Sequence, residues 1–109
     1  MSLEVPPLFA SYIEAKNAHD APALAALFTN DGVVYDEGRE IRGTDAIEAW
    51  AVEASEKYRL TTEPTAISVT GGKAVLTAVV SGMFPGSPLE FRFHFTLRDG
   101  KFASMRTEA

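Results

Sequence analysis

The sequence predicts an α+β fold, a cone-shaped barrel in which three N-terminal helices pack on a curved, mainly antiparallel sheet. Apolar residues recur at helical spacing in the first half of the chain and at a spacing of two from Arg59 onward. Helices followed by a long antiparallel sheet are typical of α+β proteins. Because 109 residues are the usual size of one domain, we expect residues 1–109 to form a single domain.

Two helices are expected in the first 28 residues. Pro6 and Pro7 suit a helix start, where a missing N–H costs nothing. The apolar face of this helix is expected to hold Leu8, Phe9, Tyr12 and Ile13, and its polar face Glu14, Lys16 and Asn17. Asp20 is expected to cap a short second helix. The apolar face of that helix would hold Leu24, Leu27 and Phe28.

A turn, a short strand and a loop are expected before the third helix. Residues 30–32, Asn-Asp-Gly, predict the turn, residues 33–36 the strand, and residues 38–43 a loop that holds Ile41 inward. Thr44 is expected to cap the third helix. Its apolar stripe comprises Ile47, Trp50, Ala51, Ala54 and Tyr58.

Four strands are expected after residue 59, at residues 60–70, 73–83, 89–98 and 101–107. Pro64 favours an edge position or a bulge in the first of them. Asp99-Gly100 predicts a tight hairpin between the last two. In residues 89–98, Phe91, Phe93 and Phe95 alternate with polar residues, so the aromatic side chains should share one face of the sheet.

Composition excludes several function classes. Fifteen acidic and ten basic residues give a net charge of −5, and no basic cluster offsets it, so neither nucleic acid nor a membrane surface is an expected partner. The chain has no cysteine, and its two histidines lie on different elements, so no metal site is predicted. No phosphate-binding glycine loop is present and no cofactor is predicted. The N-terminal residues lack a secretory pattern, so we expect a cytoplasmic protein.

A curved sheet beneath helices can enclose a cavity, which is the natural ligand site in a chain of this size. Its lining is expected to be apolar, which favours a small apolar molecule as ligand. The residues predicted to bind it are Phe28, Val34, Trp50, Phe93, Phe95 and Met105.

Several segments resemble one known superfamily in order and spacing. Residues 11–15, 17–20 and 26–36 are similar to the nuclear transport factor 2-like superfamily, and residues 43–47 and 100–106 extend the similarity over nearly the whole chain. Within the superfamily, the chain most resembles the branch of ketosteroid isomerases and SnoaL-like (polyketide cyclase) proteins.

The resemblance implies roles for two residues. Tyr12 matches the tyrosine that hydrogen-bonds the developing enolate oxygen in the isomerases, and Asp36 matches their general base. An apolar cavity disfavours a charged carboxylate and makes it a stronger base; ketosteroid isomerase is an established example of such tuning. The isomerases' second oxyanion donor corresponds to Phe93, and their supporting tyrosine to Ala51.

For both residues, a purely structural role stays open. Asp36 could instead begin a turn and bridge to Arg39 or Arg42, and Tyr12 could be a core residue whose hydroxyl reaches a backbone carbonyl. His94 should face the other side of the sheet, in solvent or at a subunit interface.

The sequence thus supports three hypotheses about function. The first is an enzyme that isomerises, cyclises or dehydrates an apolar carbonyl compound, with Asp36 as base and Tyr12 as oxyanion donor. The second is a ligand-binding module without catalysis, which the apolar residues at Phe93 and Ala51 favour. The third is a homodimeric interaction module. The superfamily resemblance implies a homodimer in each case, with the outer sheet face forming an isologous contact.

Overall fold

The computed structural model describes residues 3–108, which form three helices and six strands. In chain order these are α1 (Pro7–Asn17), α2 (Ala21–Ala25), β1 (Phe28–Asp36), β2 (Arg39–Arg42), α3 (Thr44–Tyr58), β3 (Thr61–Thr70), β4 (Lys73–Ser81), β5 (Leu89–Arg98) and β6 (Lys101–Glu108). The predicted α+β class and the three helices are confirmed.

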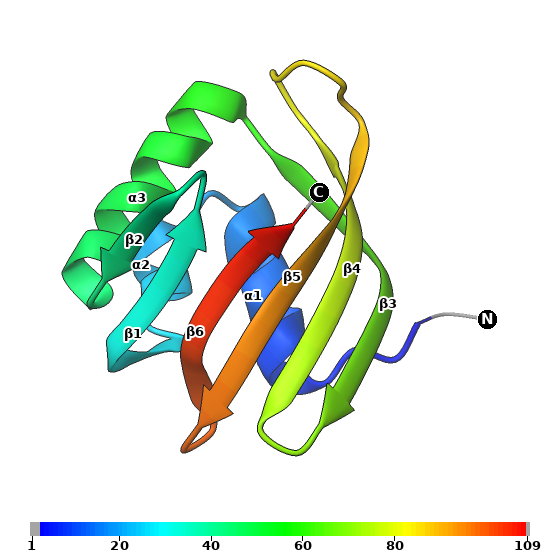
Figure 1. Ribbon diagram of the computed structural model, residues 1–109. Helices are drawn as coiled ribbons and strands as arrows, with labels where there is room; N and C mark the ends of the chain where they lie inside the picture. The colour runs from blue at the N-terminus through cyan, green and yellow to red at the C-terminus, as the bar shows by residue number, and fades with distance from the viewer. Residues whose placement is uncertain (1–2, 109) are drawn as a thin grey trace.

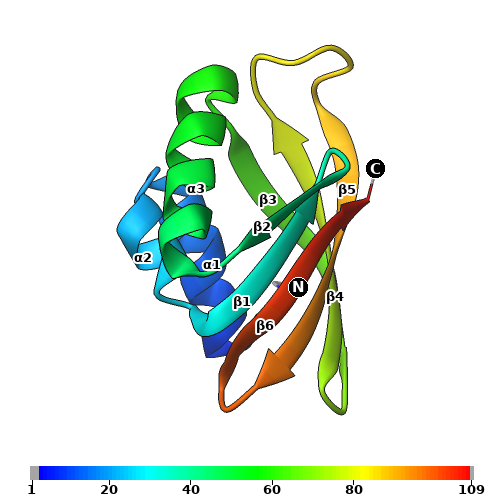
Figure 2. The ribbon, with the colours of Figure 1, turned by 60° about the vertical axis from the view of Figure 1, so that its left-hand side comes forward.

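The strands form one curved sheet in the order β2-β1-β6-β5-β4-β3. All neighbouring strands are antiparallel except β1 and β6, which run parallel. The three helices lie together against the concave face, while the opposite face carries no helix (Figures 1 and 2). The result is the expected cone, although the sheet stays open between its edge strands β2 and β3.

Two local predictions hold in detail. The Asp20 side chain accepts a hydrogen bond from Ala23 N at 3.2 Å, which satisfies a free N–H at the start of α2. Pro64 lies in edge strand β3, and the pairing register with β4 shifts between Pro64 and Ala66. The strand therefore has both the edge position and the bulge that a proline favours.

The region between α2 and α3 differs from the prediction. α2 ends at Ala25, and Phe28 begins β1 instead of extending a helical face. Phe102 N donates to Leu27 O at 2.9 Å, so the chain leaves the helix to pair with β6. The expected turn at residues 30–32 is an irregular stretch of β1, where the register with β6 shifts.

The expected loop at residues 38–43 instead contains strand β2, which pairs with β1 in a tight hairpin. Glu37 and Gly38 form its two-residue turn with φ angles of 51° and 76°. Positive φ at both positions is typical of a type I′ turn. Thr44 does not cap α3; Gly43 is the N-cap residue and no side chain caps this helix.

An aromatic core fills the narrow end of the cone between α1 and the sheet. The rings of Phe95 and Phe102 lie 4.4 Å apart, and the Phe9 ring meets each of them edge-on at 5.3 Å. The Tyr12 ring also meets Phe95 edge-on at 5.3 Å. Because these rings fill the narrow end, any cavity has to lie toward the wide end.

Beyond β4, the chain crosses toward the end of α3. The expected strand to residue 83 stops at Ser81, and Met83 N donates to Tyr58 O at 2.6 Å. A Cβ at Gly82 would lie 2.6 Å from the same carbonyl oxygen, so this close approach requires glycine. The contact holds the β4–β5 loop, with Phe84, over the wide end.

Candidate functional site

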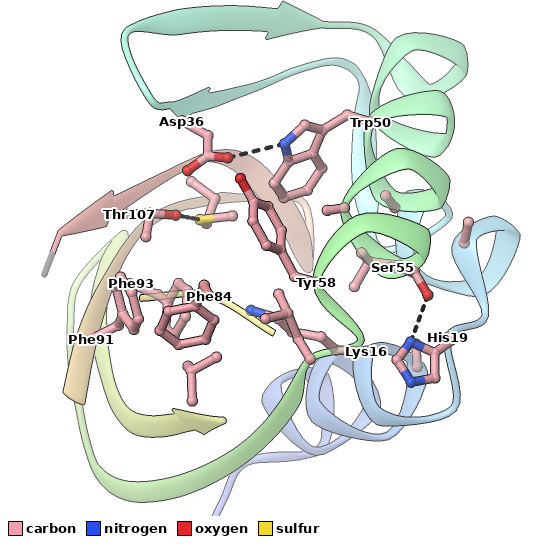
Figure 3. A pocket seen from close by; sticks show the side chains of 18 of the residues that line it. Lys16, His19, Asp36, Trp50, Ser55, Tyr58, Phe84, Phe91, Phe93 and Thr107 are labelled. Carbon is pink, nitrogen blue, oxygen red and sulfur yellow. Dashed lines mark hydrogen bonds between the residues drawn. The ribbon is translucent and has the colours of Figure 1, made fainter. Parts of the chain in front are cut away.

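A cavity of about 310 Å³ lies at the wide end of the cone, between the helices and the concave face of the sheet. Its walls are mainly apolar and include Leu24, Trp50, Val80, Phe84, Phe91 and Phe93. Charged or polar side chains enter it at a few places, with Lys16 on α1 and Asp36 at the end of β1 (Figure 3). An apolar cavity with a few polar groups is typical of a small-molecule site.

The alternation of β1 directs Asp36 to the cavity side. Val34, two residues earlier, is fully buried on the concave face, whereas Tyr35 between them is 41% exposed. The partly buried Asp36 carboxylate lines the cavity, and its Oδ2 accepts a hydrogen bond from Trp50 Nε1 at 3.2 Å. Neither Arg39 nor Arg42 forms an ion pair with Asp36 among residues 3–108. The indole therefore orients one oxygen and leaves the other without a side-chain donor in this part of the chain.

Lys16 lines the cavity, although its sequence position predicts the polar face of the first helix. Its Nζ lies 4.2 Å from the centre of the Phe93 ring, and both residues are shown in Figure 3. The same atom lies 3.5 Å from the Tyr12 hydroxyl. Burial lowers the pKa of Lys16 to about 8, and the negative charge of Asp36 opposes this change in part. Phe9, Tyr12 and Lys16 follow one another at i, i+3 and i+7, a spacing that could have shown that they share one helix face.

Tyr12 is 1% exposed and is not part of the cavity lining. Its ring belongs to the aromatic core, and its hydroxyl accepts the hydrogen bond from Lys16. Burial raises the pKa of Tyr12, and the charge of Asp36 raises it further, so the phenol stays neutral. The structure therefore brings Asp36 and Lys16 to the cavity and leaves the tyrosine behind the lysine.

The six residues predicted to bind ligand divide into two groups of three. Trp50, Phe93 and Met105 line the cavity. Phe28, Val34 and Phe95 do not; they are at most 2% exposed and lie in the core. The sequence shows which strand residues face inward, but it does not show how far along the cone the core packing extends.

Two further polar pairs belong to the lining. Tyr58 donates from its hydroxyl to Glu37 Oε1 at 3.3 Å, and His19 Nδ1 lies 2.6 Å from Ser55 Oγ. Glu37, which is exposed, was not predicted as a lining residue, because its place there depends on the type I′ turn. Within residues 3–108, no group of three or more metal-ligating side chains comes together.

Comparison with known proteins identifies the family. A family model described as the SnoaL-like domain matches residues 9–105. The chain belongs to the SnoaL-like domain family. Comparison with curated protein sequences gives no match.

Solved structures agree with the assignment of a SnoaL-like domain. A protein of Sinorhizobium meliloti, provisionally described as a polyketide cyclase, is 38% identical with a TM-score of 0.90, over 95% of each chain. A Catenulispora acidiphila protein with a ketosteroid isomerase-like fold, solved with trimethylamine, is 19% identical with a TM-score of 0.87, over 97% of this chain and 87% of its own. The superfamily expected from the sequence is thereby confirmed. Among residues 3–108, no helix of this SnoaL-like domain is long and apolar enough to cross a membrane.

Proposed function

We propose that this SnoaL-like domain binds a small apolar carbonyl compound in its cavity and transfers a proton at the carbon next to the carbonyl. Asp36 is the proposed base. The observation that carries this proposal is the position of the Asp36 carboxylate on an apolar cavity wall, where Trp50 fixes one of its oxygens. A positioned carboxylate with a free oxygen can accept such a proton. Isomerisation, cyclisation and dehydration of a carbonyl compound can each begin with this step when they proceed through an enolate.

Tyr12 remains the proposed donor to the carbonyl oxygen, as the family resemblance implies. Since its hydroxyl contacts Lys16 and is not part of the lining, direct contact with a ligand requires the lysine side chain to shift while its ammonium group stays at the cavity wall. The alternative is a module that binds the same ligand without catalysis; Phe93 and Ala51, both in the lining, supply no polar side chain. A cytoplasmic location remains a prediction from the sequence.

The proposed function can be tested with 2-tetralone, an apolar ketone with acidic hydrogens next to its carbonyl. We expect the wild-type protein to bind this ketone by calorimetry and to accelerate its deuterium uptake in D₂O, followed by NMR. Binding without faster deuterium uptake would favour the binding module. If the protein neither binds the ketone nor accelerates its deuterium uptake, both functions are contradicted for this class of ligand.

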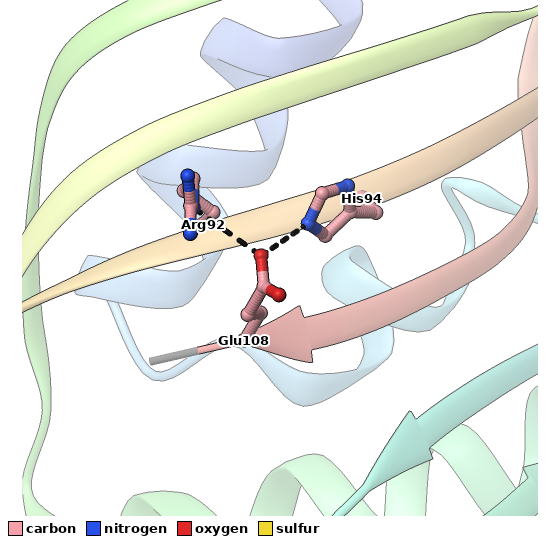
Figure 4. A network of polar contacts seen from close by, with 3 residues as sticks. All are labelled: Arg92, His94 and Glu108. Atoms are coloured by element: carbon pink, nitrogen blue, oxygen red, sulfur yellow. Dashed lines mark hydrogen bonds and ion pairs between the residues drawn. The ribbon is translucent and has the colours of Figure 1, made fainter.

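We also propose that the domain forms a homodimer through the outer face of the sheet, which no helix covers (Figure 2). On this face, Glu108 of β6 forms ion pairs with two residues of β5 (Figure 4). Its Oε1 lies 3.2 Å from Arg92 Nε and 2.9 Å from His94 Nε2. On β4, Val75 pairs with His94. A partly apolar sheet face with paired charges suits a contact between two identical copies.

Sedimentation velocity at micromolar concentration tests the dimer. We expect a dimer for the wild-type protein and a monomer for Val75→Glu, which places an unpaired charge at the proposed contact. Val52→Glu is the matched control, because Val52 is 42% exposed on α3, away from the outer sheet face. A monomeric wild-type protein at every concentration would contradict the proposal.

A further inference from the structure

The Lys16 ammonium group forms no ion pair in the part of the chain that the structure describes. Four ion pairs occur among residues 3–108, and none includes Lys16. Its one hydrogen-bond acceptor among these residues is the Tyr12 hydroxyl. An ammonium group has three N–H donors. Two donors of a cation at the cavity wall therefore have no acceptor in residues 3–108.

Aromatic faces support the charge without using those donors. The Lys16 nitrogen lies over the ring of Phe93 at 4.2 Å and near that of Tyr12 at 5.5 Å. Ring faces attract cations and partly offset the loss of water. With a pKa of about 8, the group is still mainly an ammonium at pH 7. The lysine thus presents a positive charge, and not a neutral amine, to the cavity.

Asp36 does not neutralise this charge directly. The two residues line the same cavity from α1 and from the end of β1 but form no ion pair, and the carboxylate is instead held by Trp50. An anionic group beside Lys16 would supply the direct ion-pair partner that Asp36 does not provide. The apolar walls would hold the remainder of the ligand.

We propose that Lys16 is the anion-binding group of the cavity and that the ligand is an apolar molecule carrying one oxyanion, either a carboxylate or the enolate of a carbonyl compound. The enolate form rests on the proposed function. In that case a C–H bond next to the carbonyl breaks, its proton forms an O–H bond on Asp36, and the electron pair moves onto the carbonyl oxygen beside Lys16. Return of the proton to carbon restores the carboxylate, so no other reactant is needed.

Binding of two compounds of matched shape tests the charge preference. We expect the wild-type protein to bind 2-naphthoate at least tenfold more tightly than neutral 2-naphthamide in titration calorimetry. In Lys16→Met, 2-naphthoate should bind at least tenfold more weakly while 2-naphthamide is unaffected; Lys16→Arg should keep the preference. Equal binding of the two compounds by the wild-type protein, a preference that persists in Lys16→Met, or no binding of either compound would overturn the proposal.

Benzoylacetone, an enolisable diketone, distinguishes the two sources of the oxyanion. If the ligand is an enolate, the enolate absorption of benzoylacetone should grow on binding to the wild-type protein and not on binding to Lys16→Met. A preference for 2-naphthoate without this absorption identifies a carboxylate ligand, and supports the proposal equally.

The Asp36→Asn variant separates this proposal from the proposed function. We expect this variant to lose proton transfer and to keep the preference for 2-naphthoate over 2-naphthamide. If the wild-type protein shows no deuterium exchange but retains the preference, the proton-transfer function fails and the role of Lys16 stands. Loss of the preference in Asp36→Asn would show that it does not arise from Lys16 alone, and would count against the proposal.

Discussion

The Asp36→Asn substitution is expected to slow deuterium exchange into 2-tetralone by about 10²–10⁴-fold, the usual contribution of a positioned general base. Asparagine has nearly the same shape and can still accept the hydrogen bond from Trp50 Nε1, so the cavity should keep its form. What it lacks is a carboxylate that can take the proton. The loss should therefore fall on kcat, whereas the dissociation constant of the neutral ketone should stay within about threefold.

Asp99→Asn is the matched control for this experiment. Asp99 is exposed in the β5–β6 turn with a φ of 53°, a conformation that asparagine also adopts readily. It removes the same charge from the chain without touching the cavity, so exchange should continue at the wild-type rate. Equal rates for wild-type and Asp36→Asn proteins would remove Asp36 from the mechanism.

The elements with strong local signals could be predicted from the sequence. The alternation in residues 89–98 gave the bounds of β5, and the third helix follows its apolar stripe from Thr44 to Tyr58. The β1–β2 hairpin could not be found in this way. Its turn is Glu-Gly instead of the usual Asn-Gly, and the extra length of β1 comes from pairing with β6, which is distant in sequence.

The candidate site was predicted in part for a similar reason. The family resemblance predicted Asp36, and the apolar stripe of the third helix predicted Trp50 as a lining residue; the hydrogen bond between them is a finding of the structure. Lys16 was expected on the polar face of the first helix, and charged residues are usually exposed. Its actual position depends on the aromatic residues that it meets, because its nitrogen lies against the Tyr12 hydroxyl and the Phe93 ring at the cavity wall. A one-dimensional pattern does not contain this packing.

The position of the Lys16 ammonium group should destabilise the folded protein. Burial lowers the pKa of this ammonium from 10.5 to about 8, so folding of the charged form is penalised. Lys16→Met keeps an unbranched apolar side chain and removes the charge. We expect it to raise the free energy of unfolding at pH 7 by on the order of 2 kcal/mol, a value reduced for the partial exposure of the side chain. Urea denaturation followed by circular dichroism measures this difference.

The pH dependence of the stability difference tests whether the Lys16 charge causes it. Between pH 8 and 10.5 the unfolded chain binds more protons than the folded one, so the stability of the wild-type protein should rise with pH and approach that of Lys16→Met. The other titratable groups that line the cavity or touch Lys16 are the same in both proteins: Tyr12, His19, Asp20, Asp36, Glu37 and Tyr58. Above pH 10 the raised pKa of Tyr12 lowers the stability of both proteins, so pH 7–9.5 is the window to compare.

A constant difference across this window would mean that the substitution acts through packing and not through charge. A difference that shrinks as the pH rises would show that the wild-type chain keeps a destabilising ammonium at its cavity. Substitutions that stabilise a protein and abolish a ligand preference mark positions where binding opposes stability. Lys16→Met should therefore show both effects together, a stability gain that shrinks as the pH rises and a loss of preference for 2-naphthoate. Both effects arise from the one Lys16 charge, which has no ion-pair partner among residues 3–108.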